Sequence, residues 1–341
     1  MVKRILILNS YTLTPKRAED QVRIRSFFDG LDAAGYRPDH NVDVQIVDSN
    51  SLAELATETR NAAEAGLDVI HAVGTPNAIV AAECGNGVPV VYYGAHPEGA
   101  GEAKCRNAGV SGMVLTLPFT QNYKHFRFIR KIFPKLKRVW VPFYEGTVFC
   151  KPEMKELHRE RRRSGKSPWI DGTEPLIGYR SLANLCYIIG VEYREFVYRD
   201  SEDLLWGLDQ VDNVDGGDVL MPYNDSVYCE NAPATIGNFS IDRNIPLFWN
   251  NNTEATQIGA VAAISGCFRE AGIETGKMAA AILNGTNPRS IGLLRSSKTY
   301  SSLNLVRAHA LGLEPSADVV SQFDEVITTE MFNVASPGGS M

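Results

Sequence analysis

Motifs for catalysis and metal binding are the first features to test, because each requires particular residue types at a fixed spacing. The six cysteines and six histidines form no pair at the spacing of a zinc site. Neither a Gly-x-Ser-x-Gly elbow nor a His-Glu-x-x-His motif occurs. Gly165-Lys166-Ser167 resembles the end of a phosphate-binding loop, but Glu160 occupies the position of its first glycine. The sequence therefore predicts no enzyme, no metal site and no cofactor.

Hydroxyl, amide and aromatic side chains instead gather in the loops that follow predicted strands. In an open sheet of parallel strands, ligands bind beyond the carboxyl ends of the strands. These loops offer many hydrogen-bonding groups but no nucleophile paired with a base, so they favour a recognition pocket. The candidate ligand-binding residues are Ser10, Tyr11, Thr75, Asn77, Ala95 and His96 in the first half, and Tyr144, Glu145, Tyr223, Asn224, Asp225, Trp249, Asn250 and Asn251 in the second.

The segment Gly74-Thr75-Pro76-Asn77 has a more specific interpretation. Proline suits the first turn of a helix, and Thr75 is predicted to be the N-cap of that helix. The N-terminus of a helix favours an anion, so this segment is a candidate receptor for an α-carboxylate. The competing interpretation is a plain N-cap that faces only water.

Charged and aromatic residues indicate the rest of the ligand. Glu145 and Asp225 could neutralise an ammonium group, although each is also an ordinary surface acid. Four aromatic side chains are candidates for stacking, and we expect at least two of them to contact the ligand: Tyr11, Tyr144, Tyr223 and Trp249. Phe248 and Trp249 alternate on one strand, so one of the two is expected in the core. An α-amino acid with an aromatic or apolar side chain would satisfy these groups together.

The elements that must position these loops alternate between apolar strands and helical patterns. The clearest helix is predicted to begin at Ser51, where Glu54 completes a capping box. Alternation at this pitch indicates right-handed βαβ units and parallel sheets, organised as two doubly wound domains. The predicted strands cover residues 4–9, 42–47, 68–73 and 88–93, then 138–143, 192–198, 218–221 and 245–250. Later in the chain, the pattern predicts a strand over 261–265, a helix over 276–283 and a strand over 291–295.

Length and charge set the broad class. At about 150 residues per domain, 341 residues predict two domains. The 34 basic and 40 acidic residues give a net charge of −6, which argues against nucleic-acid binding because that requires a basic face. No apolar run approaches the ~18 residues of a membrane span, and the apolar stretch after Met1 is too short for a secretory signal. We expect either a cytoplasmic protein or the mature part of an exported one.

Three local features carry separate expectations. The charge-rich segment 151–180 is interpreted as a solvated insertion, with a docking surface for a partner as the alternative. Cys84 and Cys105 are predicted to lie near enough to bridge in an oxidising compartment. His71, in the middle of an apolar strand, is expected to be a core residue rather than a catalyst.

A series of short phrases in a fixed order gives nearly the whole chain a resemblance to a known family. The phrases are Phe27-Phe28-Asp29-Gly30-Leu31, Gly74-Thr75-Pro76-Asn77-Ala78, Val88-Pro89-Val90-Val91, Pro97-Glu98-Gly99-Ala100-Gly101, Asn107-Ala108-Gly109-Val110-Ser111-Gly112, Phe133-Pro134-Lys135-Leu136-Lys137 and Gly276-Lys277-Met278-Ala279. By these phrases the chain resembles ABC-transporter substrate-binding proteins typified by tryptophan-binding lipoproteins, which have the type I periplasmic-binding-protein fold.

The resemblance implies two Rossmann-like lobes joined by three crossings, which close on a small ligand. It places residues 1–116 and about 266–289 in the N-terminal lobe, 117–265 and about 290–330 in the C-terminal lobe, and 331–341 in a disordered tail. It further implies an extracytoplasmic monomer that delivers an amino acid to an ABC permease and its ATPase. His96 and the segment 151–180 depart from the family pattern.

Two other functions are compatible with the same sequence. The first is the ligand-sensing module of a signalling receptor, which would be indicated by a flanking transmembrane segment with a kinase or cyclase domain. The second is a cytoplasmic enzyme or ligand-controlled regulator, which would be indicated by a native start at Met1. No helix-turn-helix precedes the first strand, so a DNA-binding repressor is disfavoured.

Overall fold

Two compact units make up the chain. The computed structural model describes residues 2–9, 22–38, 40–49, 51–94, 110–114, 118–146, 150, 152–171, 180–211, 216–223, 226, 229, 231–250, 253–295 and 298–328. Unit 1 comprises residues 1–117, 146–151 and 265–299, and unit 2 comprises residues 118–145, 152–264 and 300–341. Residues 290–299 therefore lie in unit 1, although the sequence division places them in the second lobe. The candidate tail 331–341 lies outside the described residues.

Unit 1 is built on a six-stranded sheet with the order β12-β5-β4-β3-β1-β2. Its strands are β1 (Lys3–Asn9), β2 (Val42–Asp48), β3 (Val69–Val73), β4 (Val90–Tyr93), β5 (Val110–Val114) and β12 (Leu293–Arg295). The pairings described for this sheet are parallel. β12 pairs with β5, which is the reason why residues 290–299 belong to this unit.

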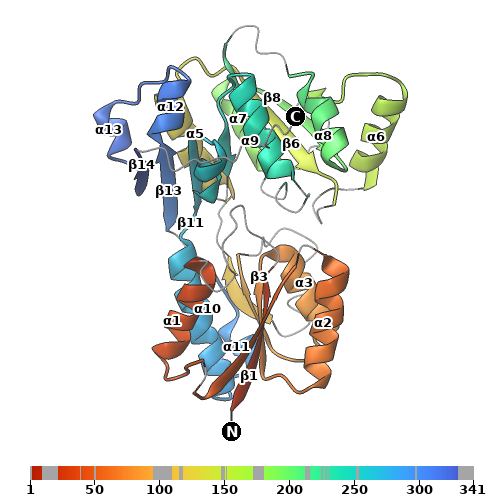
Figure 1. The fold of residues 1–341 in the computed structure, drawn as a ribbon, viewed down its shortest axis with the longest axis vertical. Coiled ribbons are helices and arrows are strands. Elements are labelled where there is room, and N and C mark those ends of the chain that lie inside the picture. The colour runs from red at the N-terminus through yellow and green to blue at the C-terminus, as the bar shows by residue number, and fades with distance from the viewer. Residues whose placement is uncertain are drawn as a thin grey trace, which may run out of the picture. The chain divides into compact units, whose positions relative to one another are not determined.

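Helices cover both faces of this sheet (Figure 1). One face carries α1 (Val22–Asp32) and α10 (Phe268–Leu283), and the other carries α2 (Leu52–Glu64) and α3 (Thr75–Cys84). Successive residues of β1 alternate between the two cores: Ile5 and Ile7 pack with α1 and α10, whereas Leu6 and Leu8 pack with α2 and α3. This two-sided burial explains why parallel strands read as continuous apolar runs.

Glycines allow α1 and α10 to approach each other closely. A Cβ added at Gly30 would lie 2.2 Å from the carbonyl oxygen of Ile273, and one added at Gly276 would lie 2.2 Å from that of Phe27. Both obstacles are backbone atoms, which cannot swing aside. Helix α10 begins at Phe268, about two turns before the helix predicted from Gly276, and the shared helix interface accounts for this length.

Unit 2 contains two four-stranded sheets. The first has the order β7-β8-β6-β9 and the second the order β10-β11-β13-β14, with a parallel bridge from Leu220 to Leu247 between them. The strands are β6 (Arg138–Tyr144), β7 (Ile170–Asp171), β8 (Glu192–Tyr198), β9 (Asp218–Leu220), β10 (Phe248–Asn250), β11 (Ala262–Gly266), β13 (Thr299–Asn304) and β14 (Glu325–Ile327). β7 is antiparallel to β8, and the other pairings described for these sheets are parallel.

Helices pack in pairs around the strands of unit 2. α5 (Pro118–Ile132) packs with α7 (Arg180–Ile189), and α8 (Ser201–Leu208) packs with α9 (Ala232–Asp242). The guanidinium of Arg130 donates to the carbonyl of Ile189, 2.6 Å away, and so ties α5 to the end of α7. The shorter elements are α11 (Pro288–Ile291) in unit 1, and the 3-10 helix Thr253–Ile258, α12 (Leu305–Ala310) and α13 (Ala317–Val320) in unit 2.

The segment predicted to be a solvated insertion is instead packed into unit 2. It forms α6 (Pro152–Arg163) and the edge strand β7. Met154 and His158 are buried one helical turn apart, and Trp169 and Ile170 are also buried. Two apolar positions four residues apart are enough to give a helix a buried face. The expectation of a solvated insertion is therefore wrong for residues 152–170.

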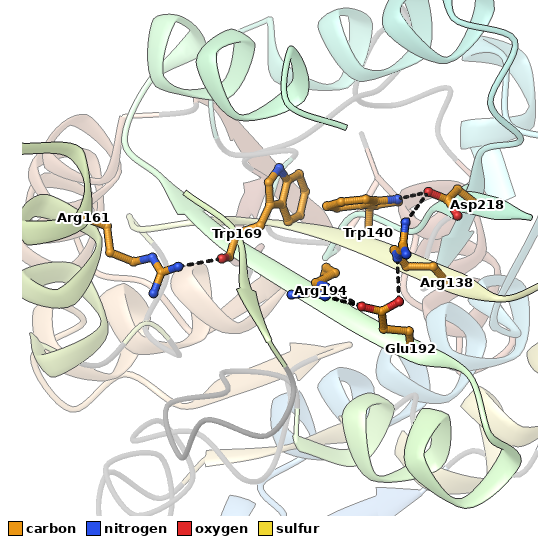
Figure 2. Close-up of polar contacts among 7 residues, drawn as sticks. All are labelled: Arg138, Trp140, Arg161, Trp169, Glu192, Arg194 and Asp218. Carbon is orange, nitrogen blue, oxygen red and sulfur yellow. Dashed lines mark hydrogen bonds and ion pairs between the residues drawn. The ribbon is translucent and has the colours of Figure 1, made fainter. Parts of the chain in front are cut away.

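A network of charged and indole groups joins the first residues of β6, β8 and β9 (Figure 2). Arg138 Nε donates to Glu192 at 2.7 Å, and Arg138 Nη1 donates to Asp218 at 3.1 Å. Trp140 Nε1 donates to Asp218 at 2.8 Å, and Arg194 donates to Glu192. Burial raises the pKa of Asp218, whereas hydrogen bonds from Arg138 and Arg194 hold the pKa of Glu192 below its usual value against the opposing effect of burial. The network fixes the register of three neighbouring strands.

The structure also bears on the predictions for Cys84 and His71. Cys84 is a free thiol in the structure, and Cys105 lies outside the described residues, so the predicted proximity of the two cysteines stays a prediction. Burial lowers the pKa of His71 to about 3, and its ring stacks on Phe27 at 3.9 Å, so it is a neutral core residue as predicted. Within the described ranges, no helix combines the length and the apolar character that a membrane crossing requires.

Candidate functional site

The carboxyl edge of the unit 1 sheet carries the first group of candidate residues. Helix α3 begins directly after β3, and its N-cap is Gly74, with a φ of 88° that suits glycine. Thr75 is therefore the first helical residue, and the prediction that it is the N-cap is wrong. Glycine takes that position because the chain must turn sharply from the strand into the helix. Gly74 has no side chain, so the N-cap residue itself contributes no side-chain hydrogen bond to the start of α3.

Asn77 holds two strand ends together at this edge. Its side chain is buried, and its Nδ2 donates to the carbonyl of Val73 at 2.6 Å and to that of Leu8 at 3.2 Å. These carbonyls belong to β3 and β1, which are neighbours in the sheet. Oδ1 of Asn77 has no hydrogen-bond partner in the part of the chain that the structure describes.

Asn9, the last residue of β1, has the same arrangement. Its side chain is buried, and its Nδ2 donates to Oδ1 of Asp48 at 2.8 Å. Its own Oδ1 lacks a partner among the described residues. Asn9 is not among the candidates predicted from the sequence, although its position at the end of a predicted strand is a signal that could identify it.

The carboxyl edge of β6 in unit 2 carries Tyr144 and Glu145. The ring of Tyr144 is half-buried and lies 5.7 Å from that of Tyr198, which ends β8. Burial raises the pKa of Tyr144, and the nearby Cys229 and Glu145 add to the effect. Glu145 donates its backbone N–H to the carbonyl of Tyr198, and its carboxylate lies 4.0 Å from the guanidinium of Arg159 on α6.

Arg159 is a second residue that the sequence analysis did not predict at this edge. It reaches Glu145 because α6 packs beside β8, so the segment 151–180 contributes to the candidate site. Arg199 directly follows β8; its hydrogen bond to Asp200 is the main cause that raises its pKa, and the charge of Glu145 adds a smaller contribution. The charge of Glu145 is therefore already balanced within its own unit.

The two remaining described aromatics belong to the core of unit 2. Tyr223 is buried and stacks on Phe143 with ring centroids 4.5 Å apart. Phe248 and Trp249 are both fully buried, so the core contains not just one of them, as expected, but both. Strand β10 sits inside the unit with both faces covered, which is why alternation does not expose either side chain. The indole Nε1 of Trp249 has no partner among the described residues.

Half of the candidate residues cannot be placed. Those outside the described residues are Ser10, Tyr11, Ala95, His96, Asn224, Asp225 and Asn251. Asn250 ends β10, but its side chain is not described. Among the residues whose placement the structure gives, no three His, Cys, Asp or Glu side chains gather in a way that would hold a metal ion. The described candidates are thus hydrogen-bonding and stacking groups at two sheet edges.

Comparison with known proteins supplies independent information on family and fold. Residues 185–327 match the family model described as ABC transporter substrate binding protein. A search of curated protein sequences finds no match. The family match confirms the resemblance that the sequence phrases indicate. It supports a solute-binding component of an ABC transporter, which is a binding protein and not an enzyme.

Three solved structures share the fold over 96% of this chain and all of theirs. A conserved domain protein from Vibrio cholerae has 18% identity and a TM-score of 0.74. The ABC domain in complex with L-Trp from Streptococcus pneumonia has 16% identity and a TM-score of 0.70. A ligand-free, open substrate-binding protein with adhesive properties from Clostridium difficile has 19% identity and a TM-score of 0.64. These structures confirm the predicted fold, two Rossmann-like lobes of the type I periplasmic-binding-protein class.

Proposed function

We propose that this protein captures an α-amino acid, with aromatic ones preferred, and delivers it to an ABC permease. The observation that carries the proposal is the family match over residues 185–327, joined to hydrogen-bonding groups at the carboxyl edges of parallel sheets. The match covers the greater part of unit 2, including its candidate residues from Tyr223 onward.

The chemistry of the edges supports an amino acid over other small solutes. The N-terminus of helix α3, whose N-cap is Gly74, suits a carboxylate because the backbone N–H groups there carry partial positive charge. Amide oxygens and carboxylates suit an ammonium group, and Tyr144 offers a half-buried ring for stacking. The L-Trp complex of the Streptococcus pneumonia structure supports an aromatic side chain in particular. We assign the protein, as a monomer, to the extracytoplasmic side of the membrane, where substrate-binding proteins of ABC importers act.

A panel of ligands tests this proposal. Thermal denaturation of the full chain, first freed of co-purified ligand, is followed with each of the twenty amino acids, with common sugars and with nucleosides. At 100 times its Kd, a ligand that binds only the native state adds about 2.7 kcal/mol to the free energy of unfolding. We expect aromatic amino acids to raise the melting temperature most. If sugars or nucleosides raise it and no amino acid does, the proposed ligand class is wrong.

Two substitutions test the candidate residues. We expect Asp225→Ala to weaken binding of the amino acid by about 2–5 kcal/mol if Asp225 pairs with a buried ammonium group. Thr75→Ala should weaken it less, because it removes only a hydroxyl beside the helix N-terminus. Calorimetry in which both variants bind as tightly as the parent protein would contradict this assignment of the ligand-binding residues.

A further inference from the structure

Three buried asparagines differ in how many ends of the side-chain amide are hydrogen-bonded within the described residues. Asn9, Asn77 and Asn304 are 0%, 0% and 1% exposed. Asn304 in unit 2 uses both ends of its amide: Nδ2 donates to the carbonyl of Thr256 at 2.9 Å, and Oδ1 accepts from the backbone N–H of Arg307 at 2.8 Å. In Asn9 and Asn77 only the NH₂ group is bonded.

The orientation of both unit 1 amides is set by their partners. Asn77 faces the carbonyl oxygens of Leu8 and Val73, and Asn9 faces the carboxylate of Asp48. Turning either amide round would place its oxygen against another acceptor, so the NH₂ group must occupy that side. The Oδ1 atoms of Asn9 and Asn77 are therefore buried acceptors without a donor in the described part of unit 1. Buried acceptors of this kind are rare, and each calls for an explanation.

Both residues lie at the edge of the unit 1 sheet at which a ligand is expected. Asn9 is the last residue of β1, and Asn77 lies in the first turn of α3, directly after β3. The amide of Asn77 bonds the carbonyl of Leu8, the residue that precedes Asn9, so the two side chains belong to adjacent parts of one sheet edge. This is the carboxyl edge, at which open parallel sheets bind ligands.

We propose that Oδ1 of Asn9 and Oδ1 of Asn77 accept hydrogen bonds from N–H donors of the solute, so that unit 1 contributes acceptors to the recognition of the ammonium group of an α-amino acid. The inference rests on the proposed function and assigns one end of its ligand. Neutral amide oxygens carry partial negative charge and accept only. They therefore favour a donor-rich cation and disfavour a second carboxylate.

The charges near each edge agree with this orientation. Asp48, bonded to Asn9, adds a negative charge beside the two amide oxygens. In unit 2, Glu145 lies 4.0 Å from Arg159, so an ammonium group beside Glu145 would compete with that guanidinium. The described part of unit 1 therefore offers acceptors without a donor, whereas Glu145 already has a cationic neighbour.

Pairs of ligands that differ only in the amino group provide the test. The pairs are L-tryptophan with indole-3-propionate, L-phenylalanine with 3-phenylpropionate, and L-leucine with 4-methylpentanoate. Calorimetry on the full chain measures both members against the parent protein, Asn77→Leu, Asn9→Leu and the control Asn304→Leu. Asn304→Leu removes a buried amide of the same size whose two ends are internally bonded. Thermal melts of each variant report any loss of folding separately.

We expect the parent to bind the amino acid much more tightly than its deamino partner. Asn77→Leu and Asn9→Leu should weaken the amino acid about 10- to 100-fold and change the deamino partner by no more than about twofold. Asn304→Leu should change neither. If Asn77→Leu does not fold, Asn9→Leu still tests the inference, because the Asn9 amide donates to a side chain and its loss leaves no backbone carbonyl without a donor.

Each other result overturns the inference. Equal binding of both members of a pair by the parent would mean that the ammonium group is not recognised, while a solute-binding function would stand. Equal weakening of both members in the Asn77 and Asn9 variants would assign these side chains a structural role only. Binding of neither member of any pair by the parent would contradict the proposed function together with this assignment.

Discussion

The carboxyl edges of the two units use different chemistry. In unit 1, the described edge presents neutral groups, the amides of Asn9 and Asn77, of which only the NH₂ ends are bonded. In unit 2, it presents the ring of Tyr144 and a carboxylate, Glu145, beside the guanidinium of Arg159. The described edge of unit 1 thus offers directional hydrogen-bonding groups, whereas that of unit 2 offers an aromatic ring beside a paired carboxylate.

The cores of the two units also differ in the groups that pack most closely. Unit 1 brings α1 and α10 together over glycines, so its tightest packing is backbone against backbone. Unit 2 packs the segment 152–170 through aromatic rings. The ring centroid of Trp169 lies 4.7 Å from that of Trp140 and 4.5 Å from that of Phe196. All four tryptophans of the chain, Trp140, Trp169, Trp206 and Trp249, lie in unit 2. Tryptophan fluorescence therefore reports on unit 2, whereas far-ultraviolet circular dichroism reports on both units.

The largest expected effect is on the aromatic packing of unit 2. Trp169 is buried, and its Nε1 donates to the carbonyl of Gly207 at 2.9 Å. We expect Trp169→Ala to lower the free energy of unfolding by about 4 kcal/mol, because it leaves a large cavity and an unbonded carbonyl. The fluorescence-monitored transition should shift to lower denaturant concentration. A loss of less than about 0.5 kcal/mol in the free energy of unfolding would mean that the segment 152–170 does not belong to the core of unit 2.

The second effect concerns the helix contact of unit 1. Gly276→Ala places a Cβ against the backbone of Phe27, so we expect a loss of about 3 kcal/mol in the free energy of unfolding. Circular dichroism should show the loss, and the fluorescence transition of unit 2 should move less. Lys277→Ala, at an exposed position of the same helix, serves as the control and should change stability by no more than about 0.5 kcal/mol. Equal shifts in both signals would argue against two separate cores.

The third effect is a dependence on pH to which each unit contributes one histidine. Burial lowers the pKa of His71 to about 3, and burial together with nearby arginines such as Arg162 lowers that of His158 to about 4. Between about pH 6.5 and pH 4 the unfolded chain takes up protons that the native chain does not, so stability falls as the pH falls. We expect His71→Leu and His158→Leu each to reduce that fall by about 3 kcal/mol. Chemical denaturation at pH 7 and pH 4 measures the difference in the free energy of unfolding. If a variant shows the same difference as the parent protein, the histidine at that position is not buried in its neutral form.

The smallest effect concerns the strand network of unit 2. Asp218→Asn keeps an acceptor for the indole of Trp140 but removes the negative charge beside Arg138. Because the guanidinium of Arg138 is partly exposed, we expect a loss of only about 1 kcal/mol, measured by urea denaturation. Asp218→Ala, which also leaves the indole without its acceptor, should cost more. If the two variants were equally stable, the indole hydrogen bond would contribute nothing.

Much of the fold could be predicted from the sequence, because parallel strands buried on both faces produce apolar runs that are easy to recognise. The runs containing Ile5 and Val139 both became buried strands as expected. The segment 152–170 was misinterpreted because its buried face depends on few residues, chiefly Met154 and Trp169, in a strongly charged stretch. The composition of the segment alone does not reveal a buried face formed by so few residues.

The candidate site was less predictable because strand ends give position but not hydrogen-bond partners. The rule for parallel sheets predicts that Asn77 lies at the sheet edge, where the structure places it, but the rule does not tell which end of the amide is bonded internally. It also could not pair Arg159 with Glu145, since that contact depends on how α6 packs on the sheet. The burial of Trp249 shows the same limit, because alternation does not reveal a strand that is covered on both faces.

The identity of the bound solute tests the central claim most directly. Mass spectrometry of the small molecule released when the purified full chain is denatured would measure it without any assumption about the ligand. The account predicts an α-amino acid, with tryptophan, phenylalanine or tyrosine first among them. A released sugar, nucleoside or organic acid without an amino group would contradict both the proposed ligand class and the role assigned to Asn9 and Asn77.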